Sequence, residues 1–582
     1  MSKRYRRYLY LTAFVLAVYV FAVLYAAYLQ GTAFYYGLLL LLPGGVFIWY
    51  LLGKMRYAAM VEKLAAGWAK VCKRERDFQD LAKMSLLFPV DTSSETLISP
   101  LTKEDLHLDL LYGLVDRTLT TPGAQVLYNM LQRPLFNAER LAERGQAIRL
   151  FDSQPQLRQK LLLRLQRLDR QKADTVTNLV WDEAVQPARL GYLPAVLAAL
   201  ALAAVISPFF LGFRGVFFGI FPMFALNFVY VHKKSAGMMI SLPAIRYLNA
   251  LILAAGDLAQ LTADSLPAYA AELTAGVQRC KGLLRKTHYN VLRLLDAFGL
   301  YDYFNYLFLL ELRRFEASMA AISREREHLQ QLYLLVGELD ALLAVSSLRA
   351  GQGTWAEPEL VEDRCFISAE EIYHPLLEQP VANSVQLPKP GAIITGSNMS
   401  GKSTFLRTIG VNALFAQTIY TCFAKSYRAG YFAIVTSINK DDYLPGGKSY
   451  FLSEAEAILA MLNNRTEKAA SLCIIDEIFR GTHSLERIPA AIAVLRYLAK
   501  QNTLSVIATH DLEVAKACTA VYTLYHFSEQ VGEGGLEFDY RLKNGLTTSW
   551  NAIRILQHLG FPAEIVEQAA AAVEKEIKWT TK

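Results

Sequence analysis

A glycine-rich segment between an apolar run and a helical stretch constrains the fold of this chain more than any other feature. Residues 396–404 read GSNMSGKST, which fits the spacing G-x-x-x-x-G-K-[ST]. The apolar run 392–395 predicts a buried strand, and residues 404–416 predict a helix. Glycines let the backbone curl so that its N–H groups converge on an anion, and the helix N-terminus adds positive potential. The pattern predicts a phosphate-binding P-loop in an α/β domain.

The residue types in this loop indicate a nucleoside triphosphate with Mg²⁺, and we expect ATP. Lys402 is expected to reach the β- and γ-phosphates, and the Ser403 hydroxyl to complete the Mg²⁺ shell. The predicted nucleotide-binding residues are Gly396, Asn398, Met399, Ser400, Gly401, Lys402, Ser403 and Thr404.

Two further strand ends carry polar side chains. The apolar run 472–475 is followed by Asp476 and Glu477, and the run 504–508 leads to His510. Ligand sites of open α/β sheets gather at the carboxyl ends of parallel strands. We therefore expect Asp476 to hold Mg²⁺, Glu477 to orient or deprotonate the attacking water, and His510 to sense the γ-phosphate.

Several segments together resemble the MutS family. Residues 396–404 are similar to the family's GPNMGGKST, and residues 475–482 (IDEIFRGT) are similar to its I-D-E-x-x-R-G-T. Residues 508–513 are similar to its A-T-H segment, and residues 447–454 (GKSYFLSE) to its G-R-S-T-F-x-x-E. Residues 373–378, together with Asn383, are similar to the H-P-x-x-E segment that precedes the family's ATPase domain. This resemblance covers residues 365–575. Residues 108–135 show a weaker resemblance to the family's helical core domain.

The resemblance implies a homodimeric ATPase. In MutS relatives two ATPase domains pair and each supplies a serine to the partner's nucleotide, which here would be Ser449. Asn398 would be the loop amide on the γ-phosphate, and residues 546–575 resemble the helical element that packs on the partner. Ser397 and Ser400 depart from the family's proline and glycine. Neither position is fixed by the phosphate-cradling template, so binding should survive.

Four long apolar stretches predict transmembrane helices in two hairpins. They cover residues 9–29, 34–52, 190–212 and 215–231. About 20 apolar residues in a helix suffice to cross a bilayer core. A cleaved signal peptide is a poor interpretation of the first stretch, because a second span follows at once and no A-x-A-like site precedes a soluble domain.

The lysines and arginines beside these stretches predict the orientation. The basic residues at 3–7, 54–56, 189 and 233–234 all fall on one side of the two hairpins, with Arg214 as the exception. Positive residues favour the cytoplasmic side. We expect a multi-pass protein of the inner (cytoplasmic) membrane, with residues 53–188 and 233–582 in the cytoplasm.

Composition agrees with a membrane-bound ATPase. Hydrophobic residues make up 53% of the 582 residues, and the mean hydropathy is +0.21. The net charge of +7 is modest for this length and gives little support to nucleic-acid binding by itself. The six cysteines show no C-x-x-C and no metal spacing, so neither a disulfide framework nor a zinc site is expected.

The expected domain order follows from these patterns. We predict a transmembrane hairpin over 1–53, a helical MutS-core-like region over 54–188, a second hairpin over 189–234, a helical core or lever region over 235–350, and an α/β P-loop ATPase domain with its C-terminal dimerisation element over 351–582.

Three functions remain open. The chain is a membrane-anchored MutS-like ATPase that changes conformation with ATP and has DNA as a candidate partner, an ABC-type transporter half, or a nucleotide-binding scaffold without useful turnover. The ABC interpretation lacks an L-S-G-G-Q segment between Lys402 and Asp476. No mismatch-reading or nuclease domain is expected.

Overall fold

The computed structural model describes most of the chain as two compact units. The described residues are 2–30, 41–72, 74–88, 96–170, 174–181, 192–287, 301–397, 399–438, 450–463, 469–532, 535–546 and 560–580. One unit combines residues 1–72, 118–122 and 151–343, and the other combines 73–117, 123–150 and 344–582. Because each unit is assembled from separated segments, the linear domain boundaries given above stay a prediction.

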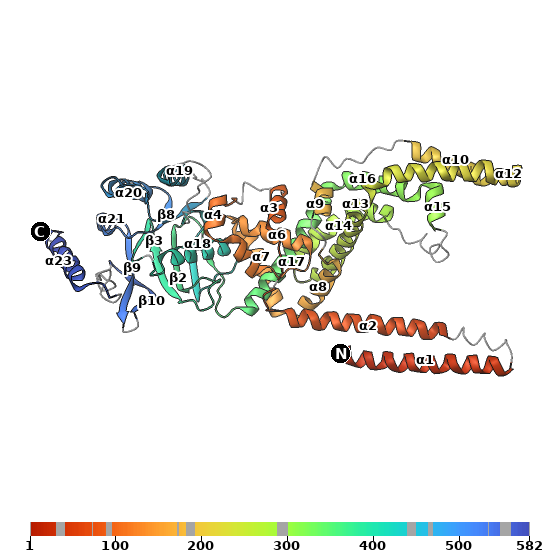
Figure 1. Ribbon diagram of the computed structural model, residues 1–582, viewed down its shortest axis with the longest axis horizontal. Coiled ribbons are helices and arrows are strands. Elements are labelled where there is room, and N and C mark those ends of the chain that lie inside the picture. The colour runs from red at the N-terminus through yellow and green to blue at the C-terminus, as the bar shows by residue number, and fades with distance from the viewer. Residues whose placement is uncertain are drawn as a thin grey trace. The chain divides into compact units, whose positions relative to one another are not determined.

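The unit that contains the N-terminus is helical throughout its described residues (Figure 1). Its helices are α1 (Ser2–Gln30), α2 (Leu41–Gly67), α8 (Pro155–Leu168), α9 (Asp174–Trp181), α10 (Leu193–Ile206), α11 (Pro208–Leu211), α12 (Phe213–Gly215), the π-helix η2 (Val216–Ile220), α13 (Phe221–Thr262), α14 (Pro267–Thr287), α15 (Tyr301–Phe308), α16 (Leu310–Arg324) and most of α17 (Arg326–Gly351).

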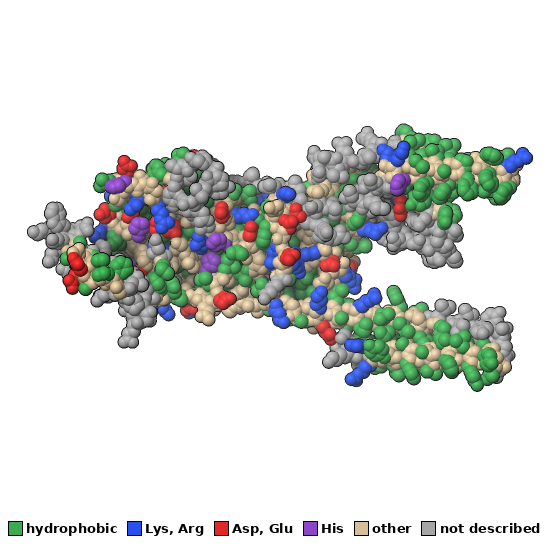
Figure 2. All heavy atoms as spheres, viewed as in Figure 1, with side chains coloured by type: hydrophobic (Ala, Val, Ile, Leu, Met, Phe, Trp, Pro, Cys, Tyr) green, Lys and Arg blue, Asp and Glu red, His purple; other side chains and the backbone are tan. Residues whose placement is uncertain are grey.

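Four helical stretches in the described residues are long and apolar enough to cross a membrane, by length and composition. They are Tyr5–Leu29, Leu193–Leu211, Phe213–Lys234 and Arg326–Gly351. The last is 89% buried within the protein, as expected of a core helix, whereas Tyr5–Leu29 is 0% buried. Figure 2 shows hydrophobic side chains covering the surface of the helices that contain the other stretches.

The predicted spans agree only in part with these helices. Residues 34–40 of the predicted span 34–52 lie outside the described residues, and 41–52 form the start of α2. Residues 190–191 of the predicted span 190–212 also lie outside the described residues, and the apolar helical stretch begins at Leu193. The helix that contains the end of the predicted span 215–231 continues beyond it, because α13 runs to Thr262.

A second unit contains two β-sheets. The six-stranded sheet has the order β10-β9-β4-β8-β7-β6, parallel except for the β9–β10 hairpin. Its strands are β4 (Gly391–Thr395), β6 (Phe432–Ser437), β7 (Ala470–Asp476), β8 (Thr503–Ala508), β9 (Thr523–Gly532) and β10 (Gly535–Asn544). A four-stranded sheet has the order β1-β5-β2-β3, with β1 (Glu359–Val361), β2 (Phe366–Ile372), β3 (Asn383–Pro388) and β5 (Ser426–Gly430).

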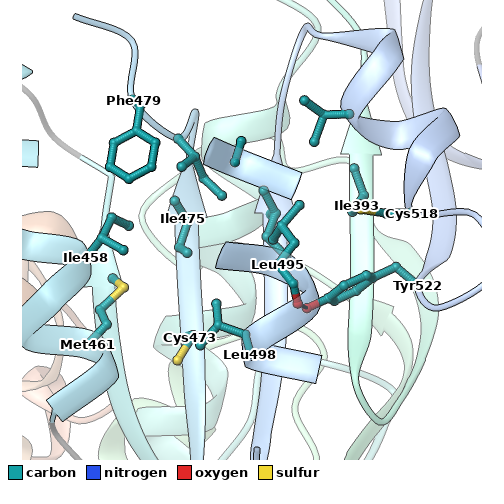
Figure 3. Close-up of a cluster of buried hydrophobic side chains, with 14 of the residues drawn as sticks. Ile393, Ile458, Met461, Cys473, Ile475, Phe479, Leu495, Leu498, Cys518 and Tyr522 are labelled. Atoms are coloured by element: carbon teal, nitrogen blue, oxygen red, sulfur yellow. Dashed lines mark hydrogen bonds between the residues drawn. The ribbon is translucent and has the colours of Figure 1, made fainter. Parts of the chain in front are cut away.

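Helices cover both faces of the six-stranded sheet. The helices of this unit are α3 (Phe78–Leu87), α4 (Pro100–Asp105), α5 (Leu108–Val115), most of α6 (Thr121–Gln132), α7 (Ala138–Ser153), α18 (Lys402–Thr418), α19 (Tyr450–Asn463), α20 (Ser484–Ala499), α21 (Leu512–Ala517) and α23 (Ala563–Thr580). On one face, Cys473 and Ile475 of β7 pack in a buried cluster with Leu495 of α20 (Figure 3). Ile474 points to the opposite face, where it lies against Gly410 of α18.

These elements confirm the sequence prediction of a mixed α/β fold with a helical remainder. The predicted strands at 392–395, 472–475 and 504–508 correspond to β4, β7 and β8, and the predicted helix 404–416 lies within α18. That the apolar stretches cross a bilayer stays a prediction.

In the helical unit, a buried carboxylate ties the short segment 118–122 to α17. Asp340 is 1% exposed, and its oxygens accept hydrogen bonds from the backbone N–H of Leu119 at 3.0 Å and of Thr120 at 2.8 Å. The Thr120 hydroxyl donates to the same carboxylate at 2.7 Å. One side chain therefore satisfies three donors of a segment that lies between helices.

Replacing Asp340 by alanine should loosen this segment. Each buried donor left without an acceptor costs about 1–3 kcal/mol, so exchange of the Leu119 and Thr120 amides should rise by about one to two orders of magnitude. Hydrogen–deuterium exchange on the detergent-solubilised chain measures this. Asp340→Asn, which keeps one acceptor oxygen, should give a smaller rise, and unchanged exchange in Asp340→Ala would contradict the assignment.

Candidate nucleotide-binding site

The glycine-rich loop lies between the carboxyl end of β4 and the first turn of α18. Gly396 and Gly401 have φ angles of +143° and +99°, which residues other than glycine rarely adopt. A Cβ atom at Gly396 would lie 2.9 Å from the carbonyl oxygen of Phe527 on β9. The loop thus requires glycine at both positions because of their φ angles. Gly396 is required also because β9 approaches it closely.

Lys402 lies beneath the loop. It is 2% exposed, and its Nζ donates to the carbonyl oxygens of Gly396 at 2.5 Å and Ser397 at 2.8 Å. Burial lowers the pKa of Lys402, while the carboxylates of Asp476, Glu477 and Glu529 oppose that effect. A buried ammonium group therefore lies at the start of the loop, close to three carboxylates.

The Ser403 hydroxyl donates a hydrogen bond to Oδ2 of Asp476, the last residue of β7. Hydroxyl and carboxylate oxygens are the hard donors that Mg²⁺ prefers, and this ion usually takes only one or two protein ligands with waters and phosphate completing the shell. The described residues hold no group of three or more His, Cys, Asp or Glu side chains that could bind a metal ion on their own. The pair therefore fits Mg²⁺ bound together with phosphate.

Glu477 is held between two basic side chains. It is 6% exposed and has a left-handed φ of +59°. Its Oε1 lies 2.9 Å from Nδ1 of His510, and its Oε2 lies 2.6 Å from Nε of Arg480. Although burial raises the pKa of Glu477, the hydrogen bond and charge of His510, followed by Arg480 and Lys402, lower it overall. Glu477 is thus a carboxylate at neutral pH.

A cavity of about 420 Å³ opens beside the loop. It is lined by Ile372, His374, Leu377, Gln379, Val381, Asn383, Met399, Gly401, Ser403, Thr404, Phe405, Thr408, Phe527 and Tyr540. Asn383 fixes one wall, because its side chain donates to Tyr540 O at 3.0 Å and accepts from Leu542 N at 2.7 Å. Burial, with the nearby Arg407 and His107, lowers the pKa of His374 to about 4, so this ring is neutral at neutral pH.

The structure brings together most of the residues that the sequence predicted. Lys402, Ser403, Asp476, Glu477 and His510 all lie at the carboxyl edge of the parallel strands, next to the loop. Of the remaining loop residues, Met399, Gly401 and Thr404 line the cavity, and Ser400 is buried. Asn398 and Ser449 lie outside the described residues.

Sequence reasoning missed three side chains of this site. Arg480 could have been suspected, since it follows Glu477 by three residues in the same motif. Tyr540 and Glu529 come from β10 and β9, and their nearness to the loop depends on the pairing of those strands. No local pattern in the sequence indicates that pairing.

The parallel sheet, the glycine-rich loop and the acidic strand end define an α/β domain of the P-loop type. Residues 392–578 match the family model for MutS domain V. Residues 392–578 are therefore a MutS domain V, and this match supports the MutS family resemblance that the sequence predicted.

Curated relatives match the same part of the chain. The DNA mismatch repair protein MutS of Thermus thermophilus is 32% identical over 252 residues, which is 43% of this chain and 30% of that protein. The MutS of Aquifex pyrophilus is 34% identical over 245 residues, 40% of this chain and 28% of that protein. The MutS of Natronomonas pharaonis is 28% identical over 272 residues, 45% of this chain and 31% of that protein. Each match thus spans about a third or less of the relative.

The contact between Glu477 and His510 predicts a measurable shift of a histidine pKa. The hydrogen bond that His510 donates to Glu477 raises the pKa of His510 above its usual value, against the effect of burial. Their ion pair should stabilise the site between the lowered pKa of Glu477 and the raised pKa of His510, and weaken as pH moves outside that window in either direction. In a histidine-selective NMR titration, Glu477→Gln should lower the pKa of His510. An unchanged pKa would show that the pair is not formed in solution.

Proposed function

We propose that this chain is a membrane-anchored MutS-like ATPase, which binds ATP with Mg²⁺ and hydrolyses it at the interface of a homodimer. The observation that carries the proposal is the meeting of Lys402, the Ser403–Asp476 pair and the Glu477–His510 pair at one sheet edge. These are the groups that phosphoryl transfer to water needs: a cation for the phosphates, oxygen donors for the metal, and a base.

Each side chain has a task that follows from its position. Lys402 balances the charge of the β- and γ-phosphates, and the cavity beside the loop holds the nucleoside. Mg²⁺, when bound by Ser403 and Asp476, supplies further charge neutralisation. Glu477 accepts a proton from water as the water oxygen bonds to the γ-phosphorus and the bond to the leaving diphosphate breaks. His510 holds Glu477 in place.

The dimer supplies what one chain lacks in this proposal. Ser449 of each subunit reaches the partner's nucleotide, Asn398 contacts the γ-phosphate, and the C-terminal helices pack on the partner. A donor from the partner stabilises phosphate charge only when a triphosphate is present, so nucleotide state controls dimer geometry. The relatives named DNA mismatch repair proteins make DNA the candidate partner whose binding this motion would control.

Turnover should depend on Glu477, and binding should not. Glu477→Gln keeps the shape of the side chain but removes the base, so hydrolysis should fall by about 10²–10⁴-fold while ATP remains bound. Phosphate release and equilibrium nucleotide binding measure the two properties separately. Glu486→Gln, the same change on the exposed first turn of α20, is the matched control. Full turnover by Glu477→Gln would contradict the assignment of Glu477 as the base, whereas an unmodified chain that binds ATP without hydrolysing it would leave only a scaffold role.

Membrane anchoring rests on the helices that expose apolar faces. Tyr5–Leu29 buries none of its apolar window within the protein, and Phe209, Phe210, Phe213 and Phe218 are each at least 77% exposed. Such a surface is costly in water and favourable in a lipid bilayer. We place the helices in the cytoplasmic membrane with the P-loop domain in the cytoplasm.

Side-specific labelling tests this placement. A membrane-impermeant maleimide should label Phe213→Cys, at the turn of the second hairpin, in intact spheroplasts of a variant that lacks the native cysteines. A variant that keeps only Cys72, which is partly exposed, should be labelled only after lysis. The reverse pattern would invert the topology, and release of the chain by alkaline carbonate would exclude anchoring altogether.

A further inference from the structure

A carboxylate lies directly on the phosphate-binding loop. The hydroxyl of Ser397, the second residue of the loop, donates a hydrogen bond to Oε2 of Glu529. Glu529 belongs to β9, which pairs with β4 in parallel and therefore runs beside the loop. The closeness of this strand is independent of the hydrogen bond, because a Cβ at Gly396 would lie 2.9 Å from Phe527 O.

The position of Lys402 shows which end of a bound phosphate chain this carboxylate would face. The Nζ atom of Lys402 lies against the carbonyl oxygens of Gly396 and Ser397. A P-loop lysine reaches the β- and γ-phosphates. The start of the loop, to which Glu529 is bonded, is therefore the end at which the terminal phosphates lie.

Glu529 also acts on Lys402 electrostatically. Its negative charge favours the protonated form of that lysine, as do Asp476 and Glu477. However, Asp476 accepts a hydrogen bond from Ser403, and Glu477 contacts His510 and Arg480. Glu529 places a third carboxylate at the γ-phosphate end of the loop, next to Ser397.

We infer that Glu529 is a specificity-determining residue that weakens binding of nucleoside triphosphate relative to diphosphate, and that Ser397 is the residue that positions it. This inference rests on the proposed function, since it concerns the same nucleotide site. The γ-phosphate adds negative charge near the carboxylate, whereas a diphosphate leaves that end of the loop empty. Charges a few ångströms apart in a partly buried site interact strongly enough to change affinity by about tenfold or more.

The test compares nucleotide affinities of the full-length chain in detergent. Calorimetry with ATP and with ADP, each with Mg²⁺, gives the ratio of the two dissociation constants. Glu529→Gln should tighten ATP binding by about tenfold and leave ADP binding within about twofold, so that the ratio shifts toward ATP. Glu371→Gln, on an exposed carboxylate of β2 that pairs with Lys425, controls for net charge and should not move the ratio.

A second variant separates charge from loop structure. Ser397→Ala keeps the Glu529 charge but releases it from the loop, so the ratio should shift in the same direction by less than in Glu529→Gln. An unchanged ratio in Glu529→Gln, or an equal weakening of both nucleotides, would overturn the inference and leave Glu529 a structural brace.

Failure of the proposed function itself would look different. If the loop binds no nucleotide, the unmodified chain and Lys402→Ala behave alike, and neither gives a binding signal. If only the inference about Glu529 is wrong, the unmodified chain binds ATP and Lys402→Ala does not. If Glu529→Gln fails to fold, as judged by its thermal transition, Ser397→Ala decides, and an unchanged ratio in that variant overturns the inference.

Discussion

The register of three parallel strands is the constraint on which the site depends. Ile394 of β4 pairs with Ala508 of β8, and Ala508 pairs with Asp476 of β7. The strands therefore end at one level, so the phosphate loop, the acidic pair and His510 leave the sheet side by side. A slip of one residue would turn every side chain of the slipped strand to the other face, and β7 and β8 are buried on both.

This register also explains how so many charges coexist in a small volume. Lys402 is enclosed by loop carbonyls and carboxylates, and Glu477 is enclosed by two basic groups. Buried charges are tolerated when each has partners of opposite sign. Glu477 also has a left-handed backbone conformation, which is strained for a residue with a side chain. Strained residues of this kind tend to cluster at functional sites.

The sequence predicted those parts of the molecule that follow local rules. Strands β4, β7 and β8 are short apolar runs, and the loop template fixes Lys402 and Ser403, so their proximity to Asp476 follows from the sheet-edge rule. Glu529 and Tyr540 were not predictable, because their positions depend on how β9 pairs with β4 and on an irregularity of the β9–β10 pairing near residue 540. Apolarity alone also does not separate the buried helix Arg326–Gly351 from a membrane span, since the difference lies in what surrounds it.

A structure of the nucleotide-bound protein in a lipid bilayer would show whether ATP is held between two membrane-anchored subunits. We expect two subunits, each with a triphosphate in the loop 396–404, a partner side chain at its terminal phosphate, and the helices 5–29 and 193–234 within the lipid. A single subunit with nucleotide bound elsewhere, or with these helices in the aqueous phase, would contradict it.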